Sequence, residues 1–231
     1  MREVDRLMIE RYGIELIQMM ENAGRNLAHL ARTRFLDGDP RGRRLKVLCG
    51  SGGNGGGGLV AARRLDNWGA GIEVVLARPE EEFTGVPAHQ LHIVRKLGIP
   101  ILATDDLTAS STSGDDLVID AVIGYGLRGS PRAGAARLIE WANRGETPVL
   151  SLDVPSGLDA STGQPGEPTV EATATMTLAL AKEGLSVASA SDFVGELYLA
   201  DISVPPTLYA EPGVELEVPA LFARDEILRI R

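Results

Sequence analysis

The chain changes its pattern of apolar residues near position 45. Residues 1–35 carry apolar side chains three or four positions apart, the spacing of an amphipathic helix, at Val4, Leu7, Met8, Leu16, Ile17, Met20, Leu27 and Leu30. Gly13 interrupts the pattern, so we predict two successive helices, the second containing the sequence MENAG at 20–24.

Short apolar runs bounded by Gly, Pro or acidic residues begin at residue 45 and predict strands. They read LKVLCG, IEVVLA, IPILA, LVIDAVIG, PVLSLDV, ATMTLAL and GELYLADIS. Three segments with helical spacing separate the earlier runs, and each ends on a glycine, which is common after a helix: GLVAARRLDNWG, PAHQLHIVRKLG and AGAARLIEWANRG. Alternating strands and helices with nearly continuous apolar strands predict an α/β fold with a mostly parallel sheet covered on both faces.

The length of 231 residues fits a single domain. We divide it into helices at 1–35, a core at 44–203 and a Pro-punctuated peripheral tail at 204–231. The net charge of −9 argues against nucleic acid or an anionic membrane as the main partner. One cysteine, Cys49, excludes an internal disulfide, and no apolar run reaches the ~20 residues of a membrane span. We therefore expect a cytoplasmic protein.

The first predicted strand end offers a glycine-rich turn. Gly50, Gly52 and Gly55 fit G-x-G-x-x-G between a strand and a helix, where glycines let backbone amides approach a pyrophosphate. No Lys-Ser/Thr pair follows Gly55, so this is not a P-loop. The alternative is a tight turn that binds nothing. Asn54 is the hydrogen-bonding side chain of the run from 52 to 58 and a candidate ligand.

Carboxylates mark two further strand ends. Asp120 lies in an apolar run and needs compensation by a metal ion, a cation or backbone amides. Asp153 ends another strand, just before Pro155-Ser156-Gly157, and either takes part in chemistry or caps that turn. Ser130-Pro131 is predicted to begin a helix.

The three histidines offer no further catalytic site. His29, His89 and His92 lie in predicted helices away from the strand ends, so a Ser-His triad or a zinc site is not expected.

Several of these motifs together resemble the NAD(P)H-hydrate epimerase family, also called the YjeF N-terminal domain. MENAG, CGSGGNGGGGLVAARRL, DAVIGYGLRG, LDVPSGLDASTG, LALAKEGL and GELYLADISVPP follow the order and spacing of that family over about nine-tenths of the chain. The resemblance implies a Rossmann-like three-layer αβα sandwich, often found as a homodimer.

The activity that the resemblance implies is the interconversion of the R and S forms of hydrated NADH or NADPH. A partner dehydratase that accepts only the S form then restores the cofactor. The resemblance assigns Asp153 as the catalytic acid/base and Asn54, Asp120 and Ser156 as ligands of a potassium ion, a hard cation that suits oxygen ligands. It also implies that substrate contacts come from Asp153 and two loops: Gly53, Asn54, Gly55, Gly56 and Gly57, then Gly124, Tyr125, Gly126, Leu127, Arg128, Gly129 and Ser130.

The glycine-rich loop departs from the family pattern. The family usually has N-N-G-G-D-G where this chain has residues 53–58, so Gly53 and Gly57 replace an asparagine and an aspartate. Losing one polar contact costs typically ~1–3 kcal/mol, which would shift affinity or substrate choice. Two alternatives remain: a non-catalytic nucleotide-binding or scaffold domain of the same fold, and an NAD-dependent dehydrogenase. The strand IEVVLARP lacks the acidic residue at its tip that a dehydrogenase uses to hold the ribose.

Overall fold

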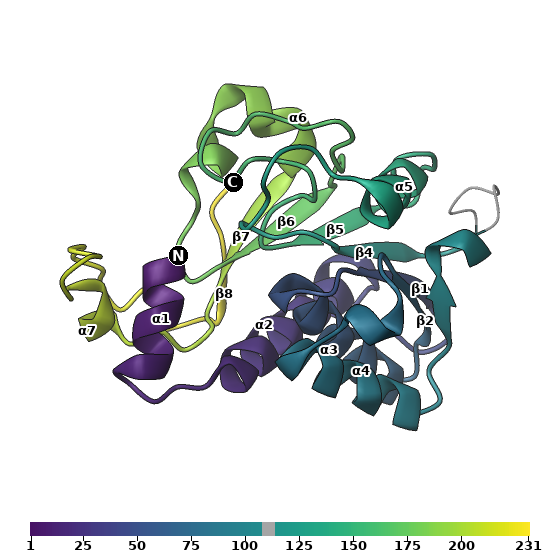
Figure 1. Ribbon diagram of the computed structural model, residues 1–231, viewed down its shortest axis with the longest axis horizontal. Coiled ribbons are helices and arrows are strands. Elements are labelled where there is room, and N and C mark those ends of the chain that lie inside the picture. The colour runs from purple at the N-terminus through teal and green to yellow at the C-terminus, as the bar shows by residue number, and fades with distance from the viewer. Residues whose placement is uncertain (108–113) are drawn as a thin grey trace.

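The computed structural model describes residues 1–107 and 114–231 and shows one eight-stranded sheet between two layers of helices (Figure 1). The helices are α1 Arg2–Glu10, α2 Leu16–Leu30, α3 Gly53–Asn67, α4 Gly85–Lys96, α5 Ala133–Ala142, α6 Ser191–Val194 and α7 Pro206–Tyr209. The strands are β1 Arg44–Cys49, β2 Gly71–Leu76, β3 Ile101–Ala103, β4 Leu117–Ala121, β5 Val149–Leu152, β6 Ala174–Leu178, β7 Glu196–Ala200 and β8 Ile227–Arg229. The predicted α/β class and the mostly parallel sheet are confirmed.

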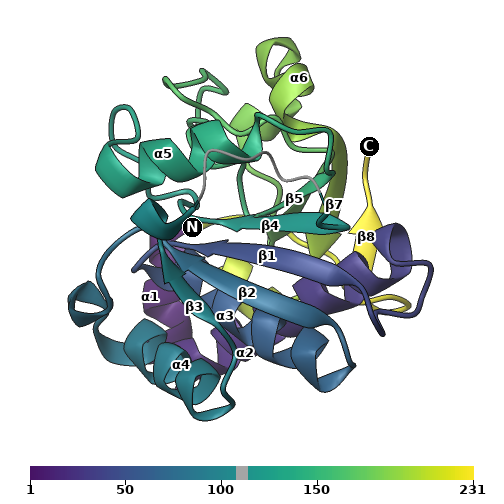
Figure 2. The ribbon, with the colours of Figure 1, turned by 90° about the vertical axis from the view of Figure 1, so that its right-hand side faces the viewer.

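The two layers follow from alternation along the strands. Val47 and Cys49 of β1 point to the side covered by α2, α3 and α4, whereas Leu48 packs with Leu138 and Ile139 of α5 on the opposite side. Because these strands are apolar on both faces, they are stable only with helices on both sides. Figure 2 shows the sheet between α5 and α6 on one side and the layer from α2 to α4 on the other.

The strand order is β3-β2-β1-β4-β5-β6-β7-β8, with all neighbours parallel except β7 and β8. From β1, the chain first moves outward to β2 and β3 and then returns to β4 on the other side. This reversal makes the carboxyl ends of β1 and β4 a topological switch point, the place where ligands bind in open α/β sheets. The end of β5 lies beside that of β4.

Glycines bring α3 unusually close to its neighbours. A Cβ at Gly58 would lie 2.6 Å from Cβ of Ala121 in β4, and a Cβ at Gly24 of α2 would lie 2.6 Å from the backbone oxygen of Gly57 and overlap Val60. Four glycines of α3, residues 55–58, are buried. The glycines at 53–58, predicted as part of a turn, instead form the first part of α3, and the buried ones pack between α2 and the sheet.

We expect Gly24→Ala to destabilise the protein by about 1–3 kcal/mol, the usual cost of overpacking. Alanine is the better helix former, but its methyl group would overlap the Val60 side chain and the carbonyl oxygen of Gly57, and this backbone oxygen cannot move aside as a side chain does. Urea unfolding measures the effect. The matched control is Gly53→Ala, where nothing lies within 4 Å of the added Cβ; equal losses of stability in both variants would contradict this explanation.

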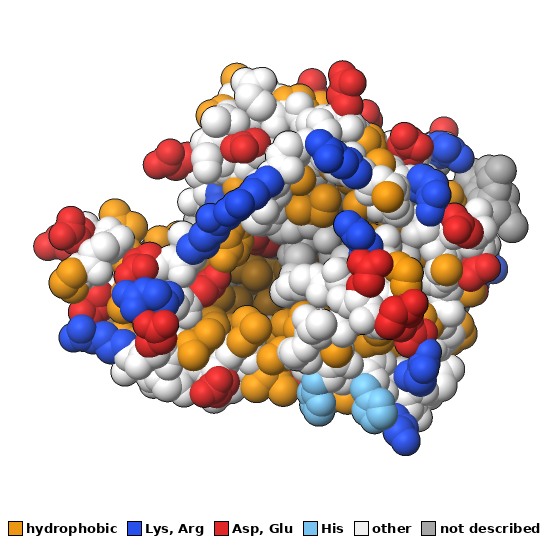
Figure 3. Space-filling view, in the orientation of Figure 1, with side chains coloured by type: hydrophobic (Ala, Val, Ile, Leu, Met, Phe, Trp, Pro, Cys, Tyr) orange, Lys and Arg blue, Asp and Glu red, His pale blue; other side chains and the backbone are white. Residues whose placement is uncertain are grey.

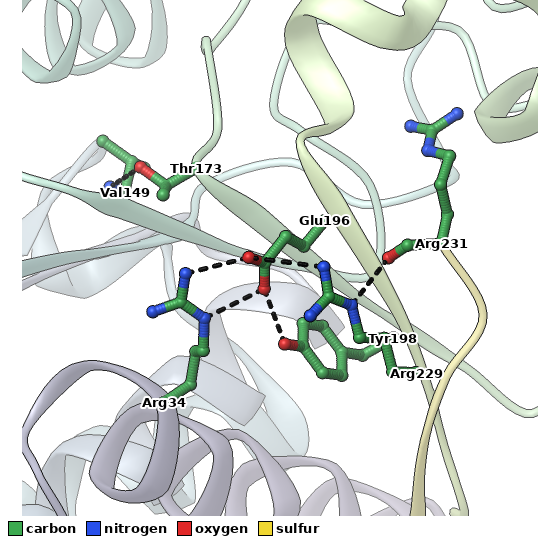
Figure 4. Close-up of polar contacts among 7 residues, drawn as sticks. All are labelled: Arg34, Val149, Thr173, Glu196, Tyr198, Arg229 and Arg231. Atoms are coloured by element: carbon green, nitrogen blue, oxygen red, sulfur yellow. Dashed lines mark hydrogen bonds and ion pairs between the residues drawn. The ribbon is translucent and has the colours of Figure 1, made fainter.

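The C-terminal segment differs from the peripheral tail that the sequence pattern predicts, because its end forms β8 at the edge of the sheet. Glu196 on β7 connects this edge to the turn after α2 (Figure 4). It accepts two hydrogen bonds from Arg34, at 2.8 and 2.9 Å, and one from the Tyr198 hydroxyl at 2.6 Å, and Arg229 of β8 lies 3.5 Å from it. The hydrogen bonds from Arg34 lower the pKa of Glu196 to about 2.

Helix α1 packs outside the two layers. Val4, Leu7 and Met8 contact Leu208 and Tyr209 of α7 and the chain that follows β6 and β7, and Figure 1 shows α1 and α7 side by side. Among residues 1–107 and 114–231, no helix is long and apolar enough to cross a membrane.

Candidate functional site

A pocket of about 490 Å³ lies at the switch point. It is lined by the turn after β1, the loop after β4 and the end of β5, and by residues of α1 and α2. Its volume falls in the range of small-molecule sites. Figure 3 shows this hollow with apolar side chains at its floor and side chains of both charges at its border.

Asp153 lies in the pocket wall directly after β5. The residue is 3 % exposed, and its backbone has a left-handed φ of 67°, a conformation that Asp and Asn tolerate better than most residues. The backbone N–H of Tyr125 donates to Oδ2 at 3.0 Å, and the Lys182 ammonium donates to Oδ1. A buried carboxylate at a strand end, held by one amide and one cation, has a fixed orientation in the pocket.

Lys182 is the charged partner that the sequence analysis did not identify as a site residue. It is 8 % exposed, and its three ammonium protons have three acceptors: Asp153, Oγ1 of Thr177 at 3.1 Å and the carbonyl of Leu178 at 2.9 Å. It does not line the pocket. The available signal was a lysine that directly follows the apolar residues 178–181, because a buried ammonium needs an anion.

Asp120 is completely buried and receives four hydrogen bonds. They come from the Ser156 hydroxyl at 2.5 Å, the Ser156 N–H at 2.8 Å, the Ser151 hydroxyl at 2.8 Å and the Val122 N–H at 3.2 Å. Burial raises the pKa of Asp120, and these hydrogen bonds act in the opposite direction. Of the three compensations expected from the sequence, a metal ion, a cation or backbone amides, the protein itself supplies two backbone amides, and two hydroxyls add to them.

Asn54 lies in the first turn of α3 and faces the pocket. Its Nδ2 atom is buried and has no hydrogen-bond partner within the described ranges 1–107 and 114–231. Gly124 separates it from Asp153: a Cβ there would lie 3.2 Å from Oδ1 of Asn54 and 3.0 Å from Oδ2 of Asp153. The glycine thus lets the amide and the carboxylate approach each other. A buried amide without a partner marks a position where a ligand completes the hydrogen bonds.

The structure separates the two predicted glycine loops into pocket and packing residues. Gly53, Gly57, Gly124, Tyr125 and Gly126 line the pocket. Two members of the first loop, Gly55 and Gly56, are buried in α3 and do not line it, and neither do residues 127–130 of the second. The predicted helix start at Ser130-Pro131 is wrong: α5 begins at Ala133 after the extended residue Arg132, so the loop is two residues longer than expected.

Gly57 occupies the position where the family pattern has aspartate. A Cβ at this position would lie 2.7 Å from Cδ2 of Leu152, the buried residue that precedes Asp153. A side chain at 57 therefore requires that Leu152 moves, and glycine and leucine at these two positions fit each other sterically.

A second carboxylate reaches the pocket from outside the sheet. Asp5 of α1 lines the pocket and accepts a hydrogen bond from the Tyr125 hydroxyl. Burial raises the pKa of Asp5, with the Tyr125 hydrogen bond opposing the shift, and burial together with Asp5 raises the pKa of Tyr125. No sequence pattern marks Asp5, because it is one acidic residue in an amphipathic helix.

The three histidines and Cys49 do not line the pocket. His29 lies in α2, and His89 and His92 lie in α4, as predicted. Cys49 is buried, and burial raises the pKa of its thiol. Among the residues with described positions, no group of three or more His, Cys, Asp or Glu side chains is arranged to hold a metal ion. A transition-metal site of that kind is thus absent from this part of the chain.

Known proteins match the chain over most of its length. A model of the family described as "YjeF-related protein N-terminus" matches residues 16–184. A protein named NAD(P)H-hydrate epimerase from Dehalogenimonas lykanthroporepellens is 44% identical over 93% of this chain and 84% of its own. Another of that name, from Pirellula staleyi, is 35% identical over 91% and 92%.

A longer relative and a solved structure complete the comparison. The bifunctional NAD(P)H-hydrate repair enzyme Nnr of Moorella thermoacetica is 37% identical over 91% of this chain, but the match spans only 40% of that protein. The crystal structure of yeast ynu0, YNL200c superposes with a TM-score of 0.77 at 24% identity, covering 99% of this chain and 96% of that one. At this identity the superposition supports the fold alone.

Proposed function

The chain belongs to the YjeF-related protein N-terminus family, and from this premise we propose that it interconverts the R and S forms of hydrated NADH or NADPH. The observation that carries the proposal is Asp153, a buried carboxylate held in the wall of a pocket of small-molecule size by Lys182 and an amide. Stand-alone relatives of similar length bear the name of this activity.

The reaction needs acid/base groups and no redox step. The ring hydroxyl leaves as water after protonation, and the ring nitrogen stabilises the resulting conjugated iminium cation. Water then adds to the same carbon from the other face and loses a proton. Positioned carboxyl groups can make these proton transfers, and general acid/base catalysis typically contributes about 10²–10⁴-fold to rate.

Other pocket residues suit the recognition of a dinucleotide. Gly52 and Gly53 open onto the pocket at the amino end of α3, where unpaired amides favour an anion such as a pyrophosphate. The unpartnered Nδ2 of Asn54 is a donor for a substrate oxygen. The apolar floor includes Met19, Met20 and Leu152 and suits a planar ring.

The residues proposed for potassium fit a hard monovalent cation. Asn54, Asp120 and Ser156 supply an amide oxygen, a carboxylate and a hydroxyl, and all come from the strand ends around the loop after β4. Asp120 is a buried carboxylate, and among residues 1–107 and 114–231 no cationic side chain donates a hydrogen bond to it. When bound, the ion would neutralise this charge and stabilise the three strand ends; the proton transfers are made by the protein's own carboxylates.

Potassium is expected to stabilise the fold in the absence of substrate. At ten times its Kd, an ion that binds only the native state adds about 1.4 kcal/mol, or about 3–6 °C in Tm for a chain of this size. Melting curves in potassium chloride and in choline chloride at equal ionic strength measure this difference. The control is Asn54→Ala, which should melt at the same temperature in both salts; a wild-type Tm independent of potassium contradicts the proposed ion site.

The scaffold alternative accounts less well for the site. A domain that only binds a partner gains nothing from burying Asp153 and Lys182 at a pocket, since buried ion pairs add little to stability. For a dehydrogenase, the tip of β2 lacks an acidic residue to hold a ribose, and Arg78 and Pro79 follow there instead. The pocket thus favours acid/base chemistry over both.

A coupled assay tests the proposal. The R epimer of hydrated NADH or NADPH is incubated with an S-specific dehydratase, and recovery of the reduced cofactor is followed by absorbance with potassium present. Adding this protein should raise the rate well above that of spontaneous epimerisation. A rate that stays at the spontaneous level overturns the proposed function.

A further inference from the structure

Epimerisation at a ring carbon has a geometric requirement that one fixed carboxylate meets poorly. The hydroxyl leaves from one face of the ring, and water returns to the other. Asp153 is held in one orientation by Lys182 and by the Tyr125 N–H. It can therefore act on one face of a bound ring, unless the ring turns over within the pocket.

Asp5 offers a second carboxylate to the same pocket. It comes from α1, a helix outside the αβα layers, whereas Asp153 follows β5. Tyr125 connects the two: its backbone N–H donates to Asp153 and its hydroxyl to Asp5, so the carboxylates lie at opposite ends of one tyrosine. Asp5, Tyr125 and Asp153 all line the pocket, so a nicotinamide ring bound there can meet both carboxylates.

The two carboxyl groups have different surroundings. Asp153 has a buried ammonium against it. Asp5 has no cationic side chain among the hydrogen bonds recorded for it within residues 1–107 and 114–231, and burial raises its pKa. A pair of carboxyl groups in unequal environments is the usual arrangement for one acid and one base.

We propose that Asp5 is a second catalytic acid/base and that Asp5 and Asp153 act on opposite faces of the hydrated nicotinamide ring. Protonated Asp5 gives its proton to the ring hydroxyl, the C–O bond breaks with its electron pair leaving on water, and the nitrogen lone pair forms the C=N bond. Water then bonds to that carbon from the other face, the C=N electrons return to nitrogen, and the proton goes to Asp153. One proton moves from Asp5 to Asp153, and the reverse reaction or solvent restores it.

Exchange of the ring hydroxyl oxygen with solvent distinguishes reaction at one face of the nicotinamide ring from reaction at the other. In water enriched in ¹⁸O, wild-type protein should place label in the hydroxyl of both epimers. Asp5→Asn keeps the shape of the side chain and can still accept the Tyr125 hydrogen bond. We expect it to lose at least about 100-fold in epimerisation, yet to keep labelling one epimer within tenfold of the wild-type rate. Asp153→Asn should label the other epimer.

Tyr125→Phe is the second variant, because it removes the hydroxyl but keeps the ring and the backbone N–H. It should slow labelling of the same epimer as Asp5→Asn. If Asp5→Asn labels both epimers at the wild-type rate, Asp5 is only structural and the inference fails. If it labels both more slowly by the same factor, a single carboxylate serves both faces, and the inference again fails.

This inference rests on the proposed function, and the assay tells their failures apart. Wild-type protein that labels neither epimer above the spontaneous rate overturns the proposed function. If wild-type protein labels both epimers but the variants do not give the expected labelling, only the role of Asp5 is overturned, and the proposed function stands.

Discussion

Asp153→Asn is expected to lower the rate of epimerisation by about 10²–10⁴-fold, the usual contribution of an acid/base group. Asparagine tolerates the left-handed φ of 67° at this position, and its oxygen can still accept the Tyr125 N–H. What it cannot do is exchange a proton with the substrate. The coupled assay measures the loss. Asp153→Ala is a poorer test, because alanine adds backbone strain of roughly 1–2 kcal/mol.

The substitution also leaves the Lys182 ammonium buried without its anion, so a loss of activity could reflect a damaged fold. The control is the double variant Asp153→Asn, Lys182→Met, which removes both charges together. Replacing both members of a buried pair is often neutral for stability. We expect the double variant to unfold near the wild-type urea midpoint and to remain inactive. A double variant with substantial activity would show that Asp153 is not the acid/base.

Lys182→Met alone is expected to have the largest effect on stability, a loss of about 3–5 kcal/mol in the free energy of unfolding, because it leaves a buried carboxylate unpaired. Asp153 is 3 % exposed, so water cannot replace the ammonium without opening the pocket wall. Urea unfolding measures the loss. Activity should fall as well, since the ammonium holds Oδ1 of Asp153 in place.

Lys182 acts through Asp153, so its role is one of positioning. The double-mutant cycle should show a coupling energy of about 0.5–3 kcal/mol between the two residues, the range for groups in contact. In the Lys182→Met variant, kcat should fall while KM stays near the wild-type value, because Lys182 does not line the pocket. Additive effects of the two substitutions on stability would contradict a direct pair.

The sequence was sufficient for the fold and for the strand ends that carry the site. Alternating apolar runs and helical segments predict the parallel sheet, and Asn54, Tyr125 and Asp153 all line the pocket. The prediction of the fold is confirmed because strand burial depends on neighbouring residues; the roles of the three site residues stay predictions. The tail was one exception: the pairing of β8 with β7 joins segments about 30 positions apart, and the three residues of β8 carry little signal.

The partners of the site residues were decided by the tertiary structure alone. Asp5, Tyr125, Asp153 and Lys182 come from four separate parts of the chain. They meet because the strand order places the ends of β4, β5 and β6 near one another and because α1 packs against the chain that follows β6 and β7. The compensation of Asp120 by Ser151 and Ser156 depends likewise on the register of β4 with β5. A sequence shows which residues can take part in chemistry. Which of them touch is a matter of long-range contacts, and periodicity and turn signals describe only local ones.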